Sequence, residues 1–398
     1  MRLASSSPHQ LYIISLTRIV LTLIVAVAAI FSTGCGGSSS MKTTLPATPA
    51  CVSSSKPAFA YVLNEGGSNW GDGTISSYTV NSCTGDLTPT AQATIATGSD
   101  PEDMVVDPLG RFVYVANLVS NAADDATISM YTINPSTGIL TPTTPATVPT
   151  GFFPQGIGID PTGKFVYTAN SDDNTVSVFS INQNTGLLTP ATPPSVATGW
   201  SPLSVTVDPS GRFAYATNQD DGTVSMYSVN PSTGVLTPTT PASVSAGGSP
   251  FELTVDPSGR FAYVPNAYGN NNVSEYTIDA TGVLTPTTQI AAPAGNSPTC
   301  VAVDPSGKFA YVVNRVDNTV SAYTIDSSSG NLSPLATIAT GVQPWRVTVD
   351  PSGHFVYVTN ESGSISIYAL NGDGTLTSAG TAGTPSGAFA IAVVSVAQ

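Results

Sequence analysis

The sequence has little histidine and few basic residues. Its 398 residues include 2 His and 11 Lys plus Arg, against 25 Asp plus Glu, for a formal net charge of −14. Nucleic-acid binding needs a basic surface, so we expect no nucleic acid partner. Only His354 lies outside the N-terminal segment, so neither a Cys/His cluster nor a Ser/His/Asp arrangement is available. Acidic pairs such as Asp220-Asp221 lack the dense ligand spacing of a calcium loop, and we expect no metal and no cofactor.

Apolar runs long enough to span a membrane are also absent. The run at residues 19–31 has 13 residues, too short for a spanning helix but typical of a signal peptide. Ser32-Thr33-Gly34-Cys35 follows and resembles a bacterial lipobox. We predict a signal peptide over residues 1–34, lipidation of Cys35 and a Ser/Thr/Pro-rich tether over residues 35–51. The chain would then be exported to the cell envelope and anchored in the membrane. An ordinary signal peptide with an incidental Cys is the alternative.

One short phrase occurs seven times in the rest of the chain. It begins as FAYVLN at residues 59–64 and ends as FVYVTN at residues 355–360, and its tyrosines are spaced by 53, 53, 48, 48, 48 and 46 residues. A fixed period of this size, built from short apolar runs, predicts a repeat architecture.

Each repeat contains four predicted strands separated by turns. In residues 201–247, a β-branched run precedes Asp208-Pro209-Ser210-Gly211, a sequence that suits a type I turn. The phrase FAYATN, an alternating run and a proline-interrupted run follow, and proline demotes the last strand to an edge. Four-stranded sheets repeated radially form a β-propeller. We predict an all-β, seven-bladed propeller over residues 52–398.

The two ends of this region complement each other. The first phrase lacks an upstream strand, whereas the last repeat is followed by a strand at residues 388–396. We expect this strand to become the innermost strand of the N-terminal blade, which removes two open sheet edges. Pro385 precedes Ile391 by six residues, as Pro344 precedes Asp350, so Pro385 is predicted to match the proline that links the other blades.

Export permits disulfides, and three cysteines remain after Cys35. Cys51 precedes the first phrase, and Cys83 lies in the third turn of the first blade. We predict a bridge between these two cysteines. Cys300 is then expected to be an unpaired and partly buried thiol.

Aromatic and charged residues depart from the repeat on one face of the predicted propeller, which carries the second turns and the inter-blade links. Loops on a rigid scaffold commonly carry binding residues. The candidates for ligand binding are Trp70, Glu102, Asp103, Trp200, Arg315 and Trp345. Simple variation of an exposed surface is the alternative interpretation.

The phrases FVYVTN and VTVDPSGRFAY resemble the YVTN-repeat propellers, and the TGxLTP turn resembles lactonase-type seven-bladed propellers related to bacterial 6-phosphogluconolactonase and carboxymuconate cyclase. This resemblance implies a site of His, Arg and Glu at the inner strand starts and after the repeated phrase. It implies Arg346 and Glu361 as catalytic residues. The family's His has no counterpart, so Glu361 or Glu252 would have to act on water in its place.

The sequence therefore leaves three functions open. The leading hypothesis is an exported, lipid-anchored monomeric propeller that binds a protein or glycan partner through its loop face. A lactone hydrolase is the alternative, although the missing His predicts no turnover of sugar lactones. A structural scaffold of the envelope is the third.

Overall fold

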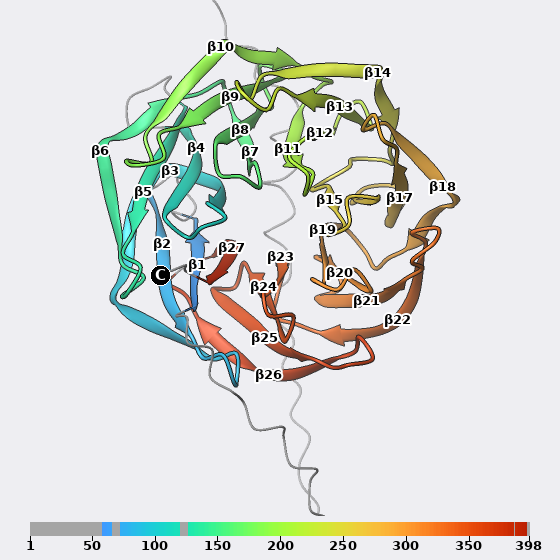
Figure 1. Ribbon diagram of the computed structural model, residues 1–398. Helices are drawn as coiled ribbons and strands as arrows, with labels where there is room; N and C mark the ends of the chain where they lie inside the picture. Colours follow the sequence, from blue (N-terminus) through green and yellow to red (C-terminus); the bar gives the residue numbers. More distant parts are fainter. Residues whose placement is uncertain (1–57, 66–71, 120–125, 386, 396–398) are drawn as a thin grey trace, which may run out of the picture. The chain divides into compact units, whose positions relative to one another are not determined.

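The computed structural model describes residues 58–65, 72–119, 126–385 and 387–395. They belong to one compact unit, Cys51–Gln398. Every regular element in the described residues is a β-strand, arranged in sheets around a common centre (Figure 1). Cys35, Cys51 and Trp70 lie outside the described residues, so lipidation of Cys35, the role of Cys51 in a disulfide and ligand binding by Trp70 stay predictions.

The strands form seven four-stranded groups, as the repeats predict. The first two groups share the long strand β3 and form one continuous sheet. Its strands are β1 (Ala58–Asn64), β2 (Asp72–Val80), β3 (Leu87–Val106), β4 (Phe112–Val119), β5 (Thr127–Ile133), β6 (Leu140–Pro149) and β27 (Ala388–Ser395).

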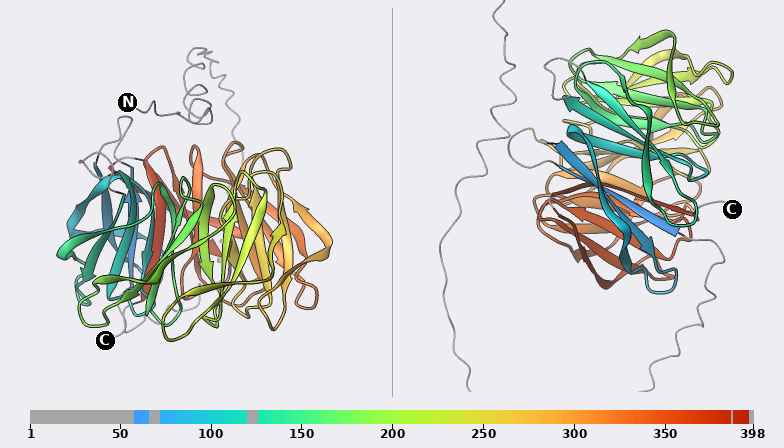
Figure 2. Two further views of the ribbon diagram at one scale, coloured as in Figure 1. Left: turned by 90° about the horizontal axis from the view of Figure 1, so that it is seen from above. Right: turned by 90° about the vertical axis from the view of Figure 1, so that its left-hand side faces the viewer.

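The other five blades are separate sheets, each with its strands in sequence order. Figure 2 shows the strands from two further sides. Blade 3 has β7 (Pro154–Ile159), β8 (Phe165–Asn170), β9 (Thr175–Ile181) and β10 (Leu188–Ala197). Blade 4 has β11 (Pro202–Val207), β12 (Phe213–Asn218), β13 (Thr223–Val229) and β14 (Leu236–Ser245). Blade 5 has β15 (Thr254–Val255), β16 (Phe261–Asn266), β17 (Asn272–Ile278) and β18 (Leu284–Pro293). Blade 6 has β19 (Pro298–Val303), β20 (Phe309–Asn314), β21 (Thr319–Ile325) and β22 (Leu332–Ala339). Blade 7 has β23 (Pro344–Val349), β24 (Phe355–Asn360), β25 (Ser364–Leu370) and β26 (Leu376–Gly383).

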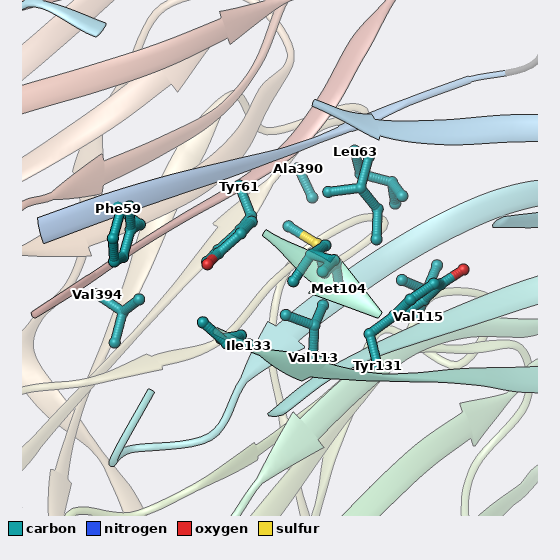
Figure 3. Close-up of a cluster of buried hydrophobic side chains, with 12 residues drawn as sticks. Phe59, Tyr61, Leu63, Met104, Val113, Val115, Tyr131, Ile133, Ala390 and Val394 are labelled. Atoms are coloured by element: carbon teal, nitrogen blue, oxygen red, sulfur yellow. The ribbon is translucent and has the colours of Figure 1, made fainter. Parts of the chain in front are cut away.

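The C-terminal strand completes the first blade. Strand β27 pairs antiparallel with β1, with Phe59 opposite Val394 and Leu63 opposite Ala390. Side chains from β1, β3, β4, β5 and β27 then form a buried cluster between the first two blades (Figure 3). The expected pairing of the last strand with the first is present.

The register of this pair corrects one prediction from the sequence. Ala388, not Pro385, pairs with Asn64, as Pro344 pairs with Asn360 in blade 7. Pro385 lies three residues earlier and outside the strand. The interval between Pro385 and Ile391 therefore did not mark the equivalent positions, because Ala388 stands where blade 7 has Pro344.

Each recurring Tyr joins its blade to the next. In blade 4 the Tyr215 hydroxyl donates a hydrogen bond to the Gly282 carbonyl at 3.1 Å. Gly282 has a φ of +83°, and a Cβ there would lie 2.2 Å from Phe213, so the turn requires glycine. The same bond joins the other pairs: Tyr61 and Gly138, Tyr114 and Gly186, Tyr167 and Gly234, Tyr263 and Gly330, Tyr311 and Gly374, Tyr357 and Gly85.

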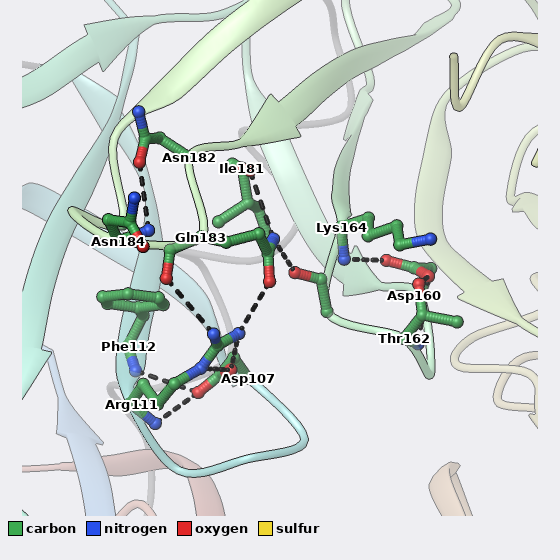
Figure 4. A network of polar contacts seen from close by, with 12 residues as sticks. Asp107, Arg111, Phe112, Asp160, Thr162, Lys164, Ile181, Asn182, Gln183 and Asn184 are labelled. Carbon is green, nitrogen blue, oxygen red and sulfur yellow. Dashed lines mark hydrogen bonds and ion pairs between the residues drawn. The ribbon is translucent and has the colours of Figure 1, made fainter. Parts of the chain in front are cut away.

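The Asp-Pro-x-Gly turns cap the outgoing end of the inner strands. In Figure 4, Asp107 accepts hydrogen bonds from the amides of Arg111 and Phe112, and the Arg111 guanidinium reaches Gln183 of the next blade at 3.1 Å. His354 occupies the matching place in blade 7, where it is exposed and bonds to Ser352. This side chain is an ordinary turn residue, as expected.

Two further observations bear on the sequence predictions. Cys300 is a buried free thiol, and Cys83 is in a disulfide. In the part of the chain that the structure describes, no helix is long and apolar enough to cross a membrane.

Candidate functional site

The inner strands bring seven equivalent residues to the centre of the propeller. Each lies two positions after the residue that pairs with the Asn of the repeated phrase, so the strand register fixes its place. In blade order, starting from β27, these residues are Ala390, Asp103, Gly156, Ser204, Glu252, Cys300 and Arg346. Three charged side chains thus stand among small residues, and these three meet.

Arg346 forms ion pairs with both carboxylates. Its Nη2 lies 3.1 Å from Asp103 Oδ1, and its Nη1 lies 2.8 Å from Glu252 Oε1. The exposed fractions of the side chains are 18% for Arg346, 7% for Asp103 and 29% for Glu252. Arg346 Nε is buried and has no hydrogen-bond acceptor among the described residues. The group therefore combines an accessible carboxylate with a guanidinium whose hydrogen-bonding capacity is not exhausted.

The protein holds Asp103 from two sides. Its carboxylate accepts hydrogen bonds from the amide of Met104 at 2.7 Å and from the amide of Ile157 in blade 3 at 3.1 Å. Burial raises the pKa of Asp103 to about 6, although Arg346 and these amides oppose the shift. Burial works against the charge of Arg346, but the neighbouring carboxylates outweigh burial and raise its pKa. Asp103 therefore positions Arg346 more than it faces a ligand.

Cys300 borders the same group. Its thiol approaches the Val347 carbonyl at 3.6 Å. Burial and the nearby Glu252 carboxylate raise the pKa of the Cys300 thiol well above its ordinary value. Because the thiolate is the nucleophilic form, this cysteine is chemically inert.

These side chains line a chamber at the centre of the propeller. Its volume is about 170 Å³, and its walls come from six of the seven blades. The lining residues are Asp103, Met104, Val105, Ile157, Glu252, Cys300, Arg346, Val347, Thr348 and Ile391. The chamber can therefore hold a small polar group against the guanidinium and the exposed carboxylate.

A second acidic group surrounds Glu102, which precedes Asp103. Burial raises the pKa of Glu102 to about 8, and Asp100, Glu65 and Asp103 add to this shift while Arg346 opposes it. Burial and neighbouring charges also raise the pKa of Glu65. With a pKa of about 8, the Glu102 carboxyl group is mostly protonated at neutral pH. Glu102 can therefore store or donate a proton beside the Arg346 group.

Glu361, which the resemblance implies as a catalytic residue, forms no ion pair with Arg346 in the structure. Glu361 instead accepts two hydrogen bonds from Arg315, at 3.0 Å from Nε and 2.6 Å from Nη2. Glu252 takes the place beside Arg346. Sequence order could not show this, because the two carboxylates come from different blades and their reach across the centre depends on the fold.

The predicted binding residue Trp345 is already covered by protein groups. Arg315 lies over its ring at 4.8 Å from the centroid, and the Phe389 ring lies 4.6 Å away at an interplanar angle of 32°. Phe251 meets it edge-on at 6.1 Å. Cation–π and aromatic contacts of this kind fix the ring in place. Trp345 therefore supports Arg315 rather than offering a free stacking surface.

The sequence did not identify Phe389 as a candidate site residue. Matching Pro385 to the link prolines shifted the predicted register of the C-terminal strand by three residues. Strand pairing makes Phe389 equivalent to Glu102, Phe251 and Trp345.

The predicted binding residue Trp200 is 67% exposed. Among the described residues, no ring contact or ion pair connects its side chain with the Arg346 group. The structure also shows no group of three His, Cys, Asp or Glu in those residues that could hold a metal ion.

The blade count, the inner-strand site and the repeated turns define a seven-bladed propeller with an arginine–carboxylate centre. The family model for "Lactonase, 7-bladed beta-propeller" matches residues 52–199, 141–249, 191–300 and 292–391. Because these matches extend over most of the chain, the protein belongs to this lactonase-type family. A search of curated proteins finds no match.

Solved structures share the fold. A candidate 6-phosphogluconolactonase from Bacteroides fragilis is 22% identical with a TM-score of 0.71, and the match covers 85% of this chain and 98% of that one. A periplasmic gluconolactonase from Pseudomonas aeruginosa is 20% identical with a TM-score of 0.70, and the match covers 86% of this chain and 100% of that one. At these identities the likeness concerns the fold alone.

Proposed function

We propose that this protein is a lactone hydrolase whose site is the Arg346 chamber. The observation that carries the proposal is the group of Arg346, Asp103 and Glu252 in the centre of a lactonase-type propeller. The two similar structures with lactonase names agree with this proposal. No comparison supports the hypothesis of a binding protein for a glycan or protein partner, and that hypothesis stays a prediction.

The side chains supply the parts that ester hydrolysis needs. The carbonyl oxygen of the lactone lies against the Arg346 guanidinium, which stabilises the negative charge that develops there. Glu252, the more exposed carboxylate, takes a proton from water as the oxygen attacks the carbonyl carbon. The ring C–O bond then breaks, and protonated Glu252 returns the proton to the departing oxygen. Asp103 holds Arg346 in place throughout.

This scheme needs no histidine. The positions where the resemblance expects one hold Glu102, Gln155, Leu203, Phe251, Thr299 and Trp345, with Phe389 in the seventh place. A carboxylate base is weaker than imidazole at neutral pH, so modest rates are expected. The carboxylates beside Arg346 also disfavour a phosphorylated substrate, because the phosphate would meet the negative charges of Asp103 and Glu252.

The test is hydrolysis of glucono-δ-lactone and δ-valerolactone by the full chain, followed through acid release. Arg346→Gln and Glu252→Gln should each lower kcat/KM by about 10²-fold or more. Arg212→Gln is the control, because this arginine lies in a turn and bonds to the Ala280 carbonyl. Wild-type rates equal to buffer for both lactones would contradict the proposal. Equal losses in the control variant would show that the effect is structural.

A further inference from the structure

A second, larger cavity adjoins the central chamber along the inner strands. This cavity has a volume of about 440 Å³ and shares Met104, Val105, Thr348 and Ile391 with the Arg346 chamber. Its other walls reach Asp107 and Pro351 in the Asp-Pro turns. Since the inner strands run from the links to these turns, the two cavities follow one another along the propeller axis.

The two cavities differ in chemistry. The Arg346 chamber holds one guanidinium and two carboxylates. The second cavity is lined mainly by aliphatic side chains, namely Met104, Val105, Val106, Ile159, Ile391, Ala392, Val393 and Val394. Asp107 contributes no free charge, because its carboxylate is buried and bonded to Arg111 and to turn amides. The lining of the second cavity is therefore more apolar than that of the Arg346 chamber.

The volumes of the two cavities favour a ligand that occupies both of them. Small-molecule pockets commonly measure about 300–1,000 Å³. The Arg346 chamber, at about 170 Å³, falls below this range, whereas the adjoining cavity at about 440 Å³ lies within it. A lactone ring held at Arg346 would fill the polar chamber, and a larger substituent can extend past Thr348 toward the adjoining cavity.

We infer that the preferred substrate is an amphiphilic lactone that carries an alkyl or acyl tail. This inference rests on the proposed lactone hydrolysis and names its substrate class. The ring occupies the Arg346 chamber, and the tail lies along β3, β23 and β27 in the aliphatic cavity. Burial of each methylene adds to binding, and a hydrophilic sugar lactone would leave this apolar surface uncovered.

The experiment compares δ-valerolactone, which has no tail, with δ-decalactone, which carries a pentyl tail. The wild type should hydrolyse δ-decalactone with at least about 10-fold higher kcat/KM, because the tail is removed from water. Two variants test the cavity from different blades. Ala392→Leu reduces its volume and Ile159→Ser makes its wall polar; each should remove most of the gain while leaving δ-valerolactone hydrolysis unchanged. Ala242→Leu, on the exposed outer strand β14, is the matched control.

Calorimetric binding of the corresponding lactams separates the two proposals, because these amides persist while bound. Tighter binding of the pentyl lactam, lost in Ala392→Leu and Ile159→Ser, with no lactone hydrolysed, would overturn the proposed reaction but support an amphiphilic ligand. Hydrolysis of δ-valerolactone with no gain from the tail would overturn the substrate class and leave the reaction standing. Equal melting temperatures of the variants and wild type exclude misfolding as the cause.

Discussion

At the scale of single residues, the site is built from departures from the repeat. The equivalent positions in other blades hold Gly156, Ser204 and Ala390, which are small and uncharged. Placing Asp103, Glu252 and Arg346 in this ring creates one buried and two partly buried charges, which are tolerated because they are paired and hydrogen-bonded. The sequence already marked all three residues as unusual. The sequence could not predict which of these residues form ion pairs, because the pairs join blades that are far apart along the chain.

Glu102 gives the pH dependence of stability a definite sign. Because its pKa is raised to about 8, the folded protein keeps a proton that the unfolded chain releases above about pH 4.3. Between these values the folded state binds more protons, so stability falls as pH rises. Asp103, with a pKa raised to about 6, acts in the same direction over the lower part of this window.

We therefore expect Glu102→Gln to weaken the pH dependence. Wild-type melting temperature should decrease from about pH 5 to about pH 8, and the variant should show a smaller decrease. Asp86→Asn, an exposed turn substitution, serves as the control and should match the wild-type slope. Parallel melting curves for wild type and Glu102→Gln would show that Glu102 is not the group that titrates.

At the scale of elements, the period of the repeat predicted most of the fold. The expected strands and turns of residues 201–247 appear as β11 to β14, with boundaries shifted by a few residues at most. Short apolar runs between Asp-Pro and Thr-Gly turns are a strong local signal. The error at Pro385 arose where the sequence departs from the repeat, because β27 begins at Ala388, whereas β7, β11, β19 and β23 begin at proline. Phe389 was lost from the candidate residues for the same reason.

Strand β27 should be essential for stability. Deleting residues 388–398 removes the partner of β1 and exposes the cluster that contains Phe59 and Val394. Val394→Asp, which keeps the strand but buries a charge, should cost several kcal/mol, on the order of 3 or more. Denaturant unfolding and size-exclusion chromatography measure both effects. A truncated protein that stays monomeric with unchanged melting would contradict this role of β27.

At the scale of the whole molecule, the prediction of an exported lipoprotein depends on residues 1–51. We predict that Cys35 carries the lipid, because an apolar run and Ser32-Thr33-Gly34 precede it. Metabolic labelling with a fatty-acid probe in a bacterial host should mark the wild type and not Cys35→Ala. Cys300→Ala is the matched control, since this thiol is buried in the propeller. Equal labelling of wild type and Cys35→Ala, or none in either, would contradict the prediction.

The pairing of β27 with β1 also has a consequence for the rate of folding. Most strand pairs join neighbours in sequence, such as Phe213 and Ser228, whereas Ala58 and Ser395 are 337 positions apart. Contacts of long sequence separation form late, because the entropy of a long loop must be lost first. The other blades can form from strands that are close in sequence, whereas the first blade is complete only after β27 has paired with β1. Refolding should therefore proceed in two kinetic phases, and the slower phase should report on Phe59 and its neighbours.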